Sequence, residues 1–246
     1  MSERWLEADW PAPPAVRTLV TTRAGGFSSG RYAGFNLGDH VGDDPADVLR
    51  NRARLDQIAG VNVPWLKQVH GVEVVDWDAR PEVALPQADA ALCRSRGRAC
   101  AVLTADCLPV LFCDRRATVV AAAHAGWRGL AAGVLETTIA RMGVAAGDVI
   151  AWLGPAIGPA AFEVGDEVRA AFLADCAAAA PAFRAGAREG KWMADLFALA
   201  RLRLERAGVG SIHGGGVCTY ADEARFYSYR RDGETGRFAS LVWLAD

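Results

Sequence analysis

Histidine is scarce in this chain, and several sequence patterns are missing altogether. Only four of the 246 residues are histidine, which excludes a centre that needs many imidazole ligands. No CxxC pair occurs among the six cysteines, so a zinc ribbon and a thioredoxin-like motif are also excluded. No apolar run reaches the roughly 18 residues that a membrane-spanning helix requires. The sequence therefore predicts neither of these cysteine motifs and no membrane span.

The nearly even balance of charge excludes a further class of protein. With 27 basic and 29 acidic residues the formal net charge is −2, whereas general nucleic-acid binders usually carry a strong basic excess. The amino-terminal stretch reads MSERWLEADWPAPPAV, with no basic region followed by an apolar segment, so no secretory signal is expected. We therefore expect a cytoplasmic protein with reduced thiols that binds neither nucleic acid nor a membrane. No particular oligomeric state is predicted.

Short apolar runs separated by turn residues alternate with segments of helical periodicity. Helices are predicted over 45–59 (with Pro45 in the first turn and Gly60 as the stop), 129–142, 166–176 and 194–207. The apolar runs predict strands, several of them buried on both faces. The fold class is therefore α/β, a single domain over residues 1–246 with mixed β-sheets flanked by helices. The predicted strands cover 15–22, 65–70, 73–77, 88–93, 99–104, 108–114, 118–126, 149–153, 211–220 (with a turn) and 238–245.

Three reactive side chains stand near the ends of predicted strands, each next to a chain breaker. His70 precedes Gly71, Cys107 precedes a Leu-Pro pair, and His124 precedes an Ala-Gly pair. The strand ends of α/β sheets cluster on one edge, where binding sites form. The intervals of 37 and 17 residues (107 − 70 and 124 − 107) each leave room for a return strand. We therefore expect the three side chains to converge.

The residue types alone leave three interpretations of this trio open. Two imidazoles and one thiolate are typical of a catalytic zinc site with an open fourth position, where bound water becomes a hydroxide donor near neutral pH. The same residues fit a Cys–His hydrolase, with Cys107 as nucleophile and His124 as base. A structural interpretation, in which Cys107 is a buried core thiol and each histidine caps a strand, fits as well.

A family resemblance separates these interpretations. The sequence contains KQVHG, TADCLPVLF, AAAHAGWRGL, GPAIGP and YSYRRDGETGRFASLVWL, and this series resembles the YfiH-like family from about Thr21 to the carboxyl terminus. The resemblance implies the YfiH-like layered fold and an enzyme that phosphorolyses adenosine, inosine and methylthioadenosine and also deaminates adenosine. It further implies that His70, Cys107 and His124 line the catalytic pocket and bind a metal, usually zinc.

The same family has also been described as a laccase-domain or multicopper polyphenol oxidase family, and the histidine count tests that description. A blue-copper centre uses two histidines and one cysteine. Only two of the four histidines would then remain for three further coppers, and no HxH pair occurs. The sequence therefore disfavours laccase chemistry as the native role. Copper at a His2Cys site could still give weak oxidase activity, because copper binds such ligands more tightly than zinc does.

Phosphorolysis brings an anionic phosphate to a sugar carbon, and arginine binds phosphate in bidentate fashion. The candidates are Arg23 beside the Gly-rich loop, Arg128 four residues after His124, and Arg230 in the carboxyl-terminal motif, where Arg231 and Arg237 also lie. The side-chain amides of Asn36 and Gln68 could read a base or a ribose. Asp89 and Asp106 are candidates for holding a liganding imidazole. His40, His213 and Cys218 are expected to be structural or supporting residues.

The sequence thus predicts a zinc-dependent purine nucleoside enzyme, with nucleoside and phosphate as its small-molecule partners. The HxE and PCxxC signature of base deaminases is absent, so a proton shuttle for deamination has to come from elsewhere, with Asp106 or Glu163 as candidates. The alternatives are a copper-dependent polyphenol oxidase, a metal-free Cys–His hydrolase, and a metal-binding protein without turnover.

Overall fold

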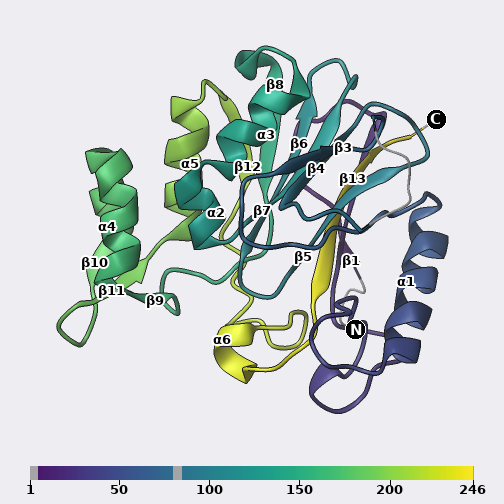
Figure 1. Ribbon diagram of the computed structural model, residues 1–246, viewed down its shortest axis with the longest axis horizontal. Coiled ribbons are helices and arrows are strands. Elements are labelled where there is room, and N and C mark those ends of the chain that lie inside the picture. Colours follow the sequence, from purple (N-terminus) through teal and green to yellow (C-terminus); the bar gives the residue numbers. More distant parts are fainter. Residues whose placement is uncertain (1–4, 80–84, 246) are drawn as a thin grey trace.

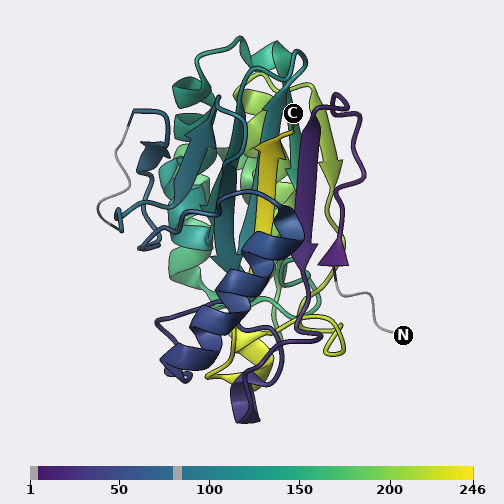
Figure 2. The same cartoon turned by 90° about the vertical axis from the view of Figure 1, so that its right-hand side faces the viewer.

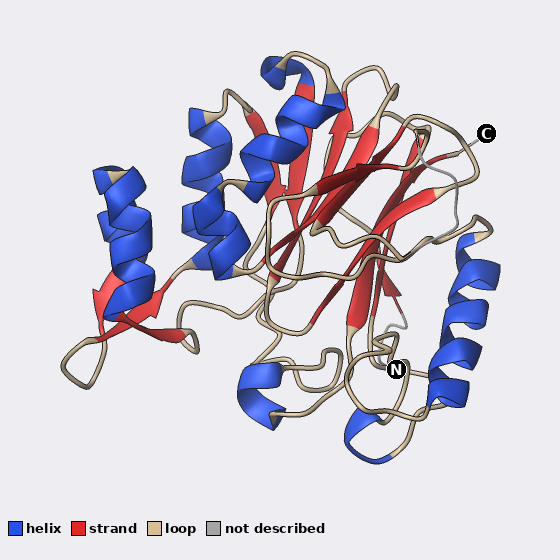
Figure 3. Ribbon diagram, in the orientation of Figure 1, coloured by secondary structure: helices blue, strands red, loops and turns tan. Residues whose placement is uncertain are grey.

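The computed structural model describes residues 5–79 and 85–245, which form three β-sheets with helices around them (Figures 1 and 3). Residues 1–4, part of the segment searched for a secretory signal, lie outside this range. The predicted α/β class with mixed sheets and flanking helices is confirmed. Among the described residues, no helix combines the length and apolar character needed to cross a membrane.

The largest sheet has six strands in the order β12-β8-β6-β7-β4-β3 and mixes parallel with antiparallel pairs. β6 is antiparallel to both β7 and β8, while β12 runs parallel to β8 and β3 runs parallel to β4. Every residue of its four inner strands is buried, as the apolar runs predict. The strands are β3 (Val74–Asp76), β4 (Ala90–Cys93), β6 (Leu108–Asp114), β7 (Val120–Ala125), β8 (Val149–Leu153) and β12 (Ser211–Gly214).

A second sheet has the order β1-β2-β13-β5 and packs against the first. The last strand, β13, lies between β2 and β5 and is antiparallel to both. One apolar core fills the space between the two sheets, and a second core lies between this sheet and α1, which crosses its outer face (Figure 2). These elements are β1 (Trp5–Leu6), β2 (Val16–Thr21), β5 (Ala99–Thr104), β13 (Phe238–Leu244) and α1 (Pro45–Ala59).

A third core joins the six-stranded sheet to the helices on its other face. A small sheet of order β10-β11-β9 carries α4 and projects at the left of Figure 1. The helices are α2 (Trp127–Ala132), α3 (Val134–Met142), α4 (Asp166–Asp175), α5 (Leu196–Arg206) and the short α6 (Tyr229–Asp232). The small strands are β9 (Glu163–Gly165), β10 (Phe183–Ala185) and β11 (Lys191–Ala194), and 3₁₀ turns cover Gly30–Tyr32, Ala146–Asp148 and Ala177–Ala182.

Local capping explains where the predicted helices begin and end. The Asp44 carboxylate accepts a 2.8 Å hydrogen bond from the backbone N–H of Ala46, and Gly60 ends α1 at φ 68°. The predicted span of 45–59 is therefore confirmed. Asp195 caps α5 in the same way through the N–H of Ala198, so this helix begins two residues later than predicted.

Two sequence predictions about secondary structure are wrong. The segment 129–142 is two helices, because Gly133 takes a φ of 101° and separates α2 from α3. The segment 65–70 is a loop with a single bridge between Lys67 and Gln87, and His70 within it has a φ of 61°. A left-handed residue cannot continue a strand, so His70 is delivered by a loop.

Candidate metal centre and substrate cavity

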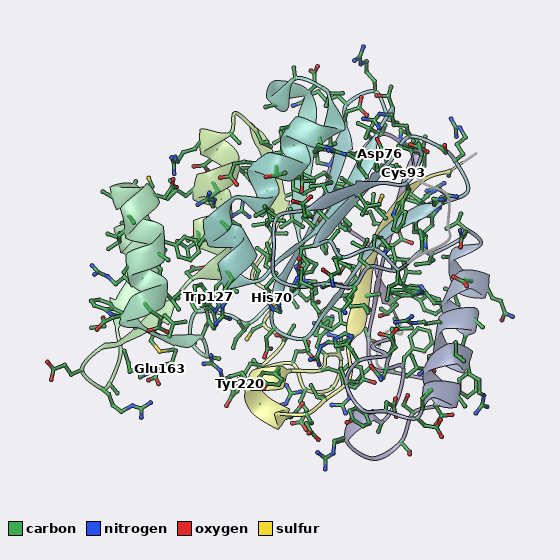
Figure 4. The ribbon with its side chains drawn as sticks, viewed as in Figure 1. His70, Asp76, Cys93, Trp127, Glu163 and Tyr220 are labelled. Carbon is green, nitrogen blue, oxygen red and sulfur yellow. The ribbon has the colours of Figure 1, made fainter. Side chains whose placement is uncertain are left out.

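His70, Cys107 and His124 meet at one end of the six-stranded sheet. Their ligand atoms all lie within 4.8 Å of one another, with the Cys107 Sγ 3.9 Å from the His70 Nε2. The two imidazole rings stand edge to face, with centroids 4.7 Å apart. In Figure 4, His70 lies between α2 and α6, while Cys93 and Asp76 mark the opposite end of the sheet. Within residues 5–79 and 85–245, no other group of three His, Cys, Asp or Glu side chains has metal-binding geometry.

A buried carboxylate, Asp89, holds two of the three ligands in place. Its oxygens accept hydrogen bonds from the backbone N–H groups of Val69 (3.1 Å), His70 (2.8 Å) and Gly71 (2.7 Å). The same carboxylate lies 2.8 Å from the His124 Nδ1. This contact leaves the His124 Nε2 as the ligand atom, an arrangement typical of metal-bound histidine. Asp89 and Asp106 were the two candidates for orienting a liganding imidazole, and Asp89 is the one that contacts an imidazole.

Two glycines of the HAGWRG motif permit the close approach of the ligand loops. A Cβ atom on Gly126 would lie 2.8 Å from the His70 Cδ2 and 3.1 Å from the Cys107 Sγ. On Gly129 it would lie 2.8 Å from the carbonyl oxygen of Gly71. A larger residue at either position would push the loop that carries His70 away from the sheet.

The electrostatics of the trio favour a thiolate. Burial alone raises the pKa of Cys107, but the charge of His124 and hydrogen bonds from both histidines outweigh burial and lower the pKa to about 6. Burial lowers the pKa of His124, but Cys107 and Asp89 raise it to about 9. In contrast, burial raises the pKa of Cys93 to about 11. Cys107 thus differs chemically from a core cysteine.

The donor set fits a zinc ion. Two imidazole nitrogens and one thiolate are ligands that zinc takes in catalytic sites. Tetrahedral coordination separates a sulfur ligand from a nitrogen ligand by about 3.6 Å, close to the 3.9 Å between the Cys107 Sγ and the His70 Nε2. The thiolate at neutral pH is the form of Cys107 that metal binding requires. His124, whose pKa is about 9, would release its Nε2 proton when a metal binds, while its Nδ1 keeps the contact with Asp89.

The trio opens into a cavity of about 370 Å³, within the size range of small-molecule sites. An apolar part of its wall consists of Leu103, Ile157 and Phe162, joined by the ring of Tyr229. A polar part carries two guanidinium groups and an imidazole. The polar wall residues beyond the metal ligands are His40, Gln68, Thr104, Asp106, Arg230 and Arg237.

Asp106 attaches the carboxyl-terminal segment to this cavity. Its carboxylate accepts hydrogen bonds from the hydroxyls of Thr219 (2.7 Å) and Ser228 (3.0 Å) and from the backbone N–H of Arg230 (2.6 Å). The alternative that Asp106 holds a liganding imidazole is therefore wrong, because its oxygens are directed at Thr219, at Ser228 and at the first turn of α6. This contact places Arg230 and Tyr229 at the cavity wall.

The predicted substrate residues fall into two groups. Gln68 and Arg230 belong to the cavity wall, although the Gln68 amide bonds the backbone of Leu103 in both directions (2.7 and 2.8 Å). Arg23, Asn36 and Arg128 are not among the described residues of the wall.

Each of these three side chains has other contacts. Arg23 lies over the ring of Tyr227 at 4.9 Å, and Arg128 lies over the ring of Trp127 at 4.4 Å. Asn36 is buried and bonds the backbone N–H groups of Gly38 and Arg237. Asn36 therefore stabilises the backbone of its loop, and Arg23 and Arg128 lie outside the cavity.

The sequence predicted a structural role for His40, but the structure places this residue on the cavity wall. Its largely exposed ring lies 3.4 Å from the Asp39 carboxylate, and partial desolvation together with the charge of Arg237 lowers its pKa. Its position in the long Gly-rich loop is the one signal that could have indicated a site role. Cys218, predicted to support the pocket, accepts a hydrogen bond from the N–H of Gly158 (3.2 Å).

Fold and site together define an α/β protein with a His–Cys–His centre at one sheet end, beside a cavity lined by arginine. Residues 17–245 match the family model described as multi-copper polyphenol oxidoreductase laccase. Curated relatives carry the YfiH name, so the chain belongs to the YfiH family, and the resemblance seen in the sequence is confirmed.

Similar proteins cover essentially the whole chain. It is 58% identical to a purine nucleoside phosphorylase of Pseudomonas aeruginosa over 98% of this chain and 99% of that protein. It is 52% identical to the purine nucleoside phosphorylase YfiH of Escherichia coli over 96% of both. A crystal structure of a Neisseria meningitidis DUF152 protein is 54% identical and superposes with a TM-score of 0.96, covering 99% of this chain and 100% of that one.

Proposed function

We propose that the chain is a zinc-dependent purine nucleoside phosphorylase that acts on adenosine, inosine and methylthioadenosine. The observation that carries this proposal is the opening of the His70, Cys107 and His124 trio into a cavity whose wall also holds Arg230 and Arg237. A metal-binding trio and two cationic groups that can bind phosphate thus share one cavity. The names of the relatives from Pseudomonas aeruginosa and Escherichia coli support the same activity.

The two wall arginines are suited to hold phosphate. In phosphorolysis an oxygen of phosphate bonds to ribose C1′ while the bond from C1′ to the purine nitrogen breaks; the electron pair leaves with the base, which gains a proton. The Arg230 Nη1 donates to the carbonyls of Ala161 and Glu163 (3.3 and 2.9 Å). The Arg237 Nη1 donates to those of Thr235 and Gly236 (2.8 and 3.0 Å). These bonds fix each guanidinium and leave its Nη2 to face an anion.

The remaining wall residues exclude water and orient the base. Leu103, Ile157 and Phe162 present apolar surface, which disfavours hydrolysis of the same bond by water. A zinc ion bound by the trio would supply a Lewis acid beside the reacting atoms. Asp89 holds His70 and His124 in place through its four contacts.

Adenosine deamination is proposed as a secondary activity. It needs a carboxylate that transfers protons, and Asp106 is the carboxylate among the described wall residues. Glu163, the other candidate, lies 2.6 Å from the Arg188 guanidinium and is not among those wall residues. Because three donors already occupy the Asp106 oxygens, we expect deamination to be slower than phosphorolysis.

The test is product chromatography of inosine, adenosine and methylthioadenosine incubated with the metal-replete protein, with and without phosphate. We expect hypoxanthine and ribose 1-phosphate from inosine only when phosphate is present. Inosine formed from adenosine without phosphate supports the deaminase activity. If no base is released from any of the three nucleosides, the phosphorylase proposal is wrong.

Copper-dependent phenol oxidation is an alternative because the matching family model carries a laccase description. The two histidines outside the trio do not build a further copper centre: His40 lies on the cavity wall and His213 bonds the Ser211 hydroxyl (3.0 Å). No second ligand group is present in the described part of the chain. Oxygen uptake that requires copper, with no nucleoside turnover, would favour the oxidase.

The metal-free Cys–His hydrolase is a second alternative, favoured by the low pKa of Cys107. In chelated protein, we expect iodoacetamide to alkylate Cys107 at a rate that rises with pH through a midpoint of about 6, because the thiolate forms above that pH. Mass spectrometry of the modified peptide measures this rate, with Cys107→Ser as control. A midpoint near the ordinary thiol pKa contradicts the thiolate assignment. Activity that survives chelation but not alkylation would favour the hydrolase.

A further inference from the structure

Thr104 lies on the cavity wall, and its buried hydroxyl has no hydrogen-bond partner among the described residues. The residue is 2% exposed, and the described part of the chain offers its Oγ1 no donor or acceptor. The other buried side-chain atoms in this condition belong to residues outside the described cavity wall. A buried hydroxyl normally has a partner, and leaving it unpaired costs free energy of unfolding. Because Thr104 lines the cavity, a turn of its side chain would bring this hydroxyl to a group bound there.

The strand end that carries Thr104 is held rigidly. Thr104 is the last residue of β5 and pairs with Phe238 of β13. The preceding residue, Leu103, is bound on both backbone groups by the Gln68 amide. Cys107 follows three residues later and belongs to the metal-binding trio. A group bound by Thr104 is therefore positioned relative to the reacting centre.

The chemistry of a hydroxyl narrows the choice of partner. Phosphate accepts hydrogen bonds and is matched by guanidinium groups, which only donate, whereas a threonine hydroxyl both donates and accepts. The three proposed substrates differ at purine C6 and at ribose C5′, and they share the 2′- and 3′-hydroxyls. A contact that serves all three must go to a shared group, and a sugar hydroxyl also both donates and accepts.

We propose that Thr104 binds a secondary hydroxyl of the ribose, at C2′ or C3′, and so positions the nucleoside for cleavage; this inference rests on the proposed phosphorylase function. Thr104 is a specificity-determining residue in this role, since it distinguishes ribosides from deoxynucleosides. A site built to bond a substrate hydroxyl discriminates strongly against the analogue that lacks it.

The test uses Thr104→Val, which keeps the shape of the side chain and removes the hydroxyl. We expect kcat/KM for inosine to fall roughly 10- to 100-fold, mainly through KM. The stability of the ligand-free variant in urea should be unchanged or higher, because no bond is lost there. Thr104→Ser retains the hydroxyl and should restore most of the activity.

Deoxynucleosides decide between a ribose contact and any other role. The ratio of wild-type to Thr104→Val kcat/KM should return to about one for either 2′-deoxyinosine or 3′-deoxyinosine, whichever lacks the bound hydroxyl. Ser240→Ala removes another buried unpaired hydroxyl, on β13 outside the described wall, and should leave kcat/KM unchanged.

Three outcomes overturn the inference. Equal kcat/KM for wild type and Thr104→Val on inosine shows that the hydroxyl has no substrate contact. An equal loss with inosine and both deoxynucleosides shows that the contact is not to the ribose. If the metal-replete wild type releases no base from inosine, adenosine or methylthioadenosine, the phosphorylase proposal fails, and this inference fails with it.

Discussion

Replacing Cys107 with alanine is expected to abolish the phosphate-dependent cleavage of inosine. The change removes the only thiolate of the trio and one of the three ligands that lie within 4.8 Å of one another. Since a catalytic metal contributes several kcal/mol of transition-state stabilisation, kcat/KM should fall by about a thousandfold or more. Product chromatography measures activity, and elemental analysis of the purified variant measures bound zinc.

A matched control separates loss of the metal from loss of any thiol. Cys176→Ala removes a half-buried thiol that is not among the wall residues of the cavity and should keep both zinc content and kcat/KM. The two variants should have similar unfolding midpoints in the absence of metal. If Cys107→Ala retains zinc and inosine cleavage within tenfold of wild type, the trio is not the metal centre of the reaction.

Asp89→Asn is expected to weaken metal binding and destabilise the fold together. The wild-type carboxylate accepts from three consecutive backbone N–H groups and contacts the His124 Nδ1. Asparagine offers one acceptor oxygen and turns its NH₂ toward these donors. We expect the free energy of unfolding to fall by about 2–4 kcal/mol and zinc affinity to fall roughly 10- to 100-fold. Urea unfolding and competitive zinc titration measure the two effects.

The chain offers a close control for this variant in Asp114. That buried carboxylate also accepts from three backbone N–H groups, those of Arg116, Thr118 and Val119, in the turn that follows β6. Asp114→Asn should lower stability comparably and leave zinc affinity unchanged. Equal zinc affinity in both variants would show that Asp89 has no influence on the metal ligands.

The Asp89 contacts also predict how the stability of the metal-free protein depends on pH. Burial raises the pKa of Asp89. The hydrogen bond and charge of His124, together with the backbone N–H groups, lower this pKa by more than burial raises it, so the net pKa is below the ordinary value. The stabilising contribution of the carboxylate is therefore fully present above the unfolded pKa of about 3.9 and is lost as pH falls through the lower folded value.

Local signals in the sequence predicted much of the fold. Asp44 and Pro45 act on the first turn of α1 and Gly60 acts on its last turn, so local contacts fix both ends without help from the rest of the chain. The inner strands are buried on both faces, and their continuous apolar runs show this directly. The break at Gly133 was not predicted, because the flanking segments are both helical and only the glycine φ of 101° separates them.

The sequence predicted the three metal-binding residues of the candidate site, but not the contacts that hold these residues in place. Strand ends and breakers drew attention to His70, Cys107 and His124. The sequence did not show that His70 is held in a left-handed conformation by a loop whose N–H groups bind Asp89, 19 residues away. Such a contact has no local sequence signal. His40 was missed for a similar reason, since its place on the wall results from the folded path of the Gly-rich loop.

The position of β13 has a consequence for the order in which the molecule can assemble. This strand ends at residue 244 and fills the slot between β2 and β5, which begin at residues 16 and 99. During synthesis, β2 and β5 each keep an unpaired edge until residues 238–244 have emerged. Domains with such distant pairings fold slowly and expose aggregation-prone edges meanwhile. We therefore expect nascent chains without residues 238–244 to expose the edges of β2 and β5 to aggregation.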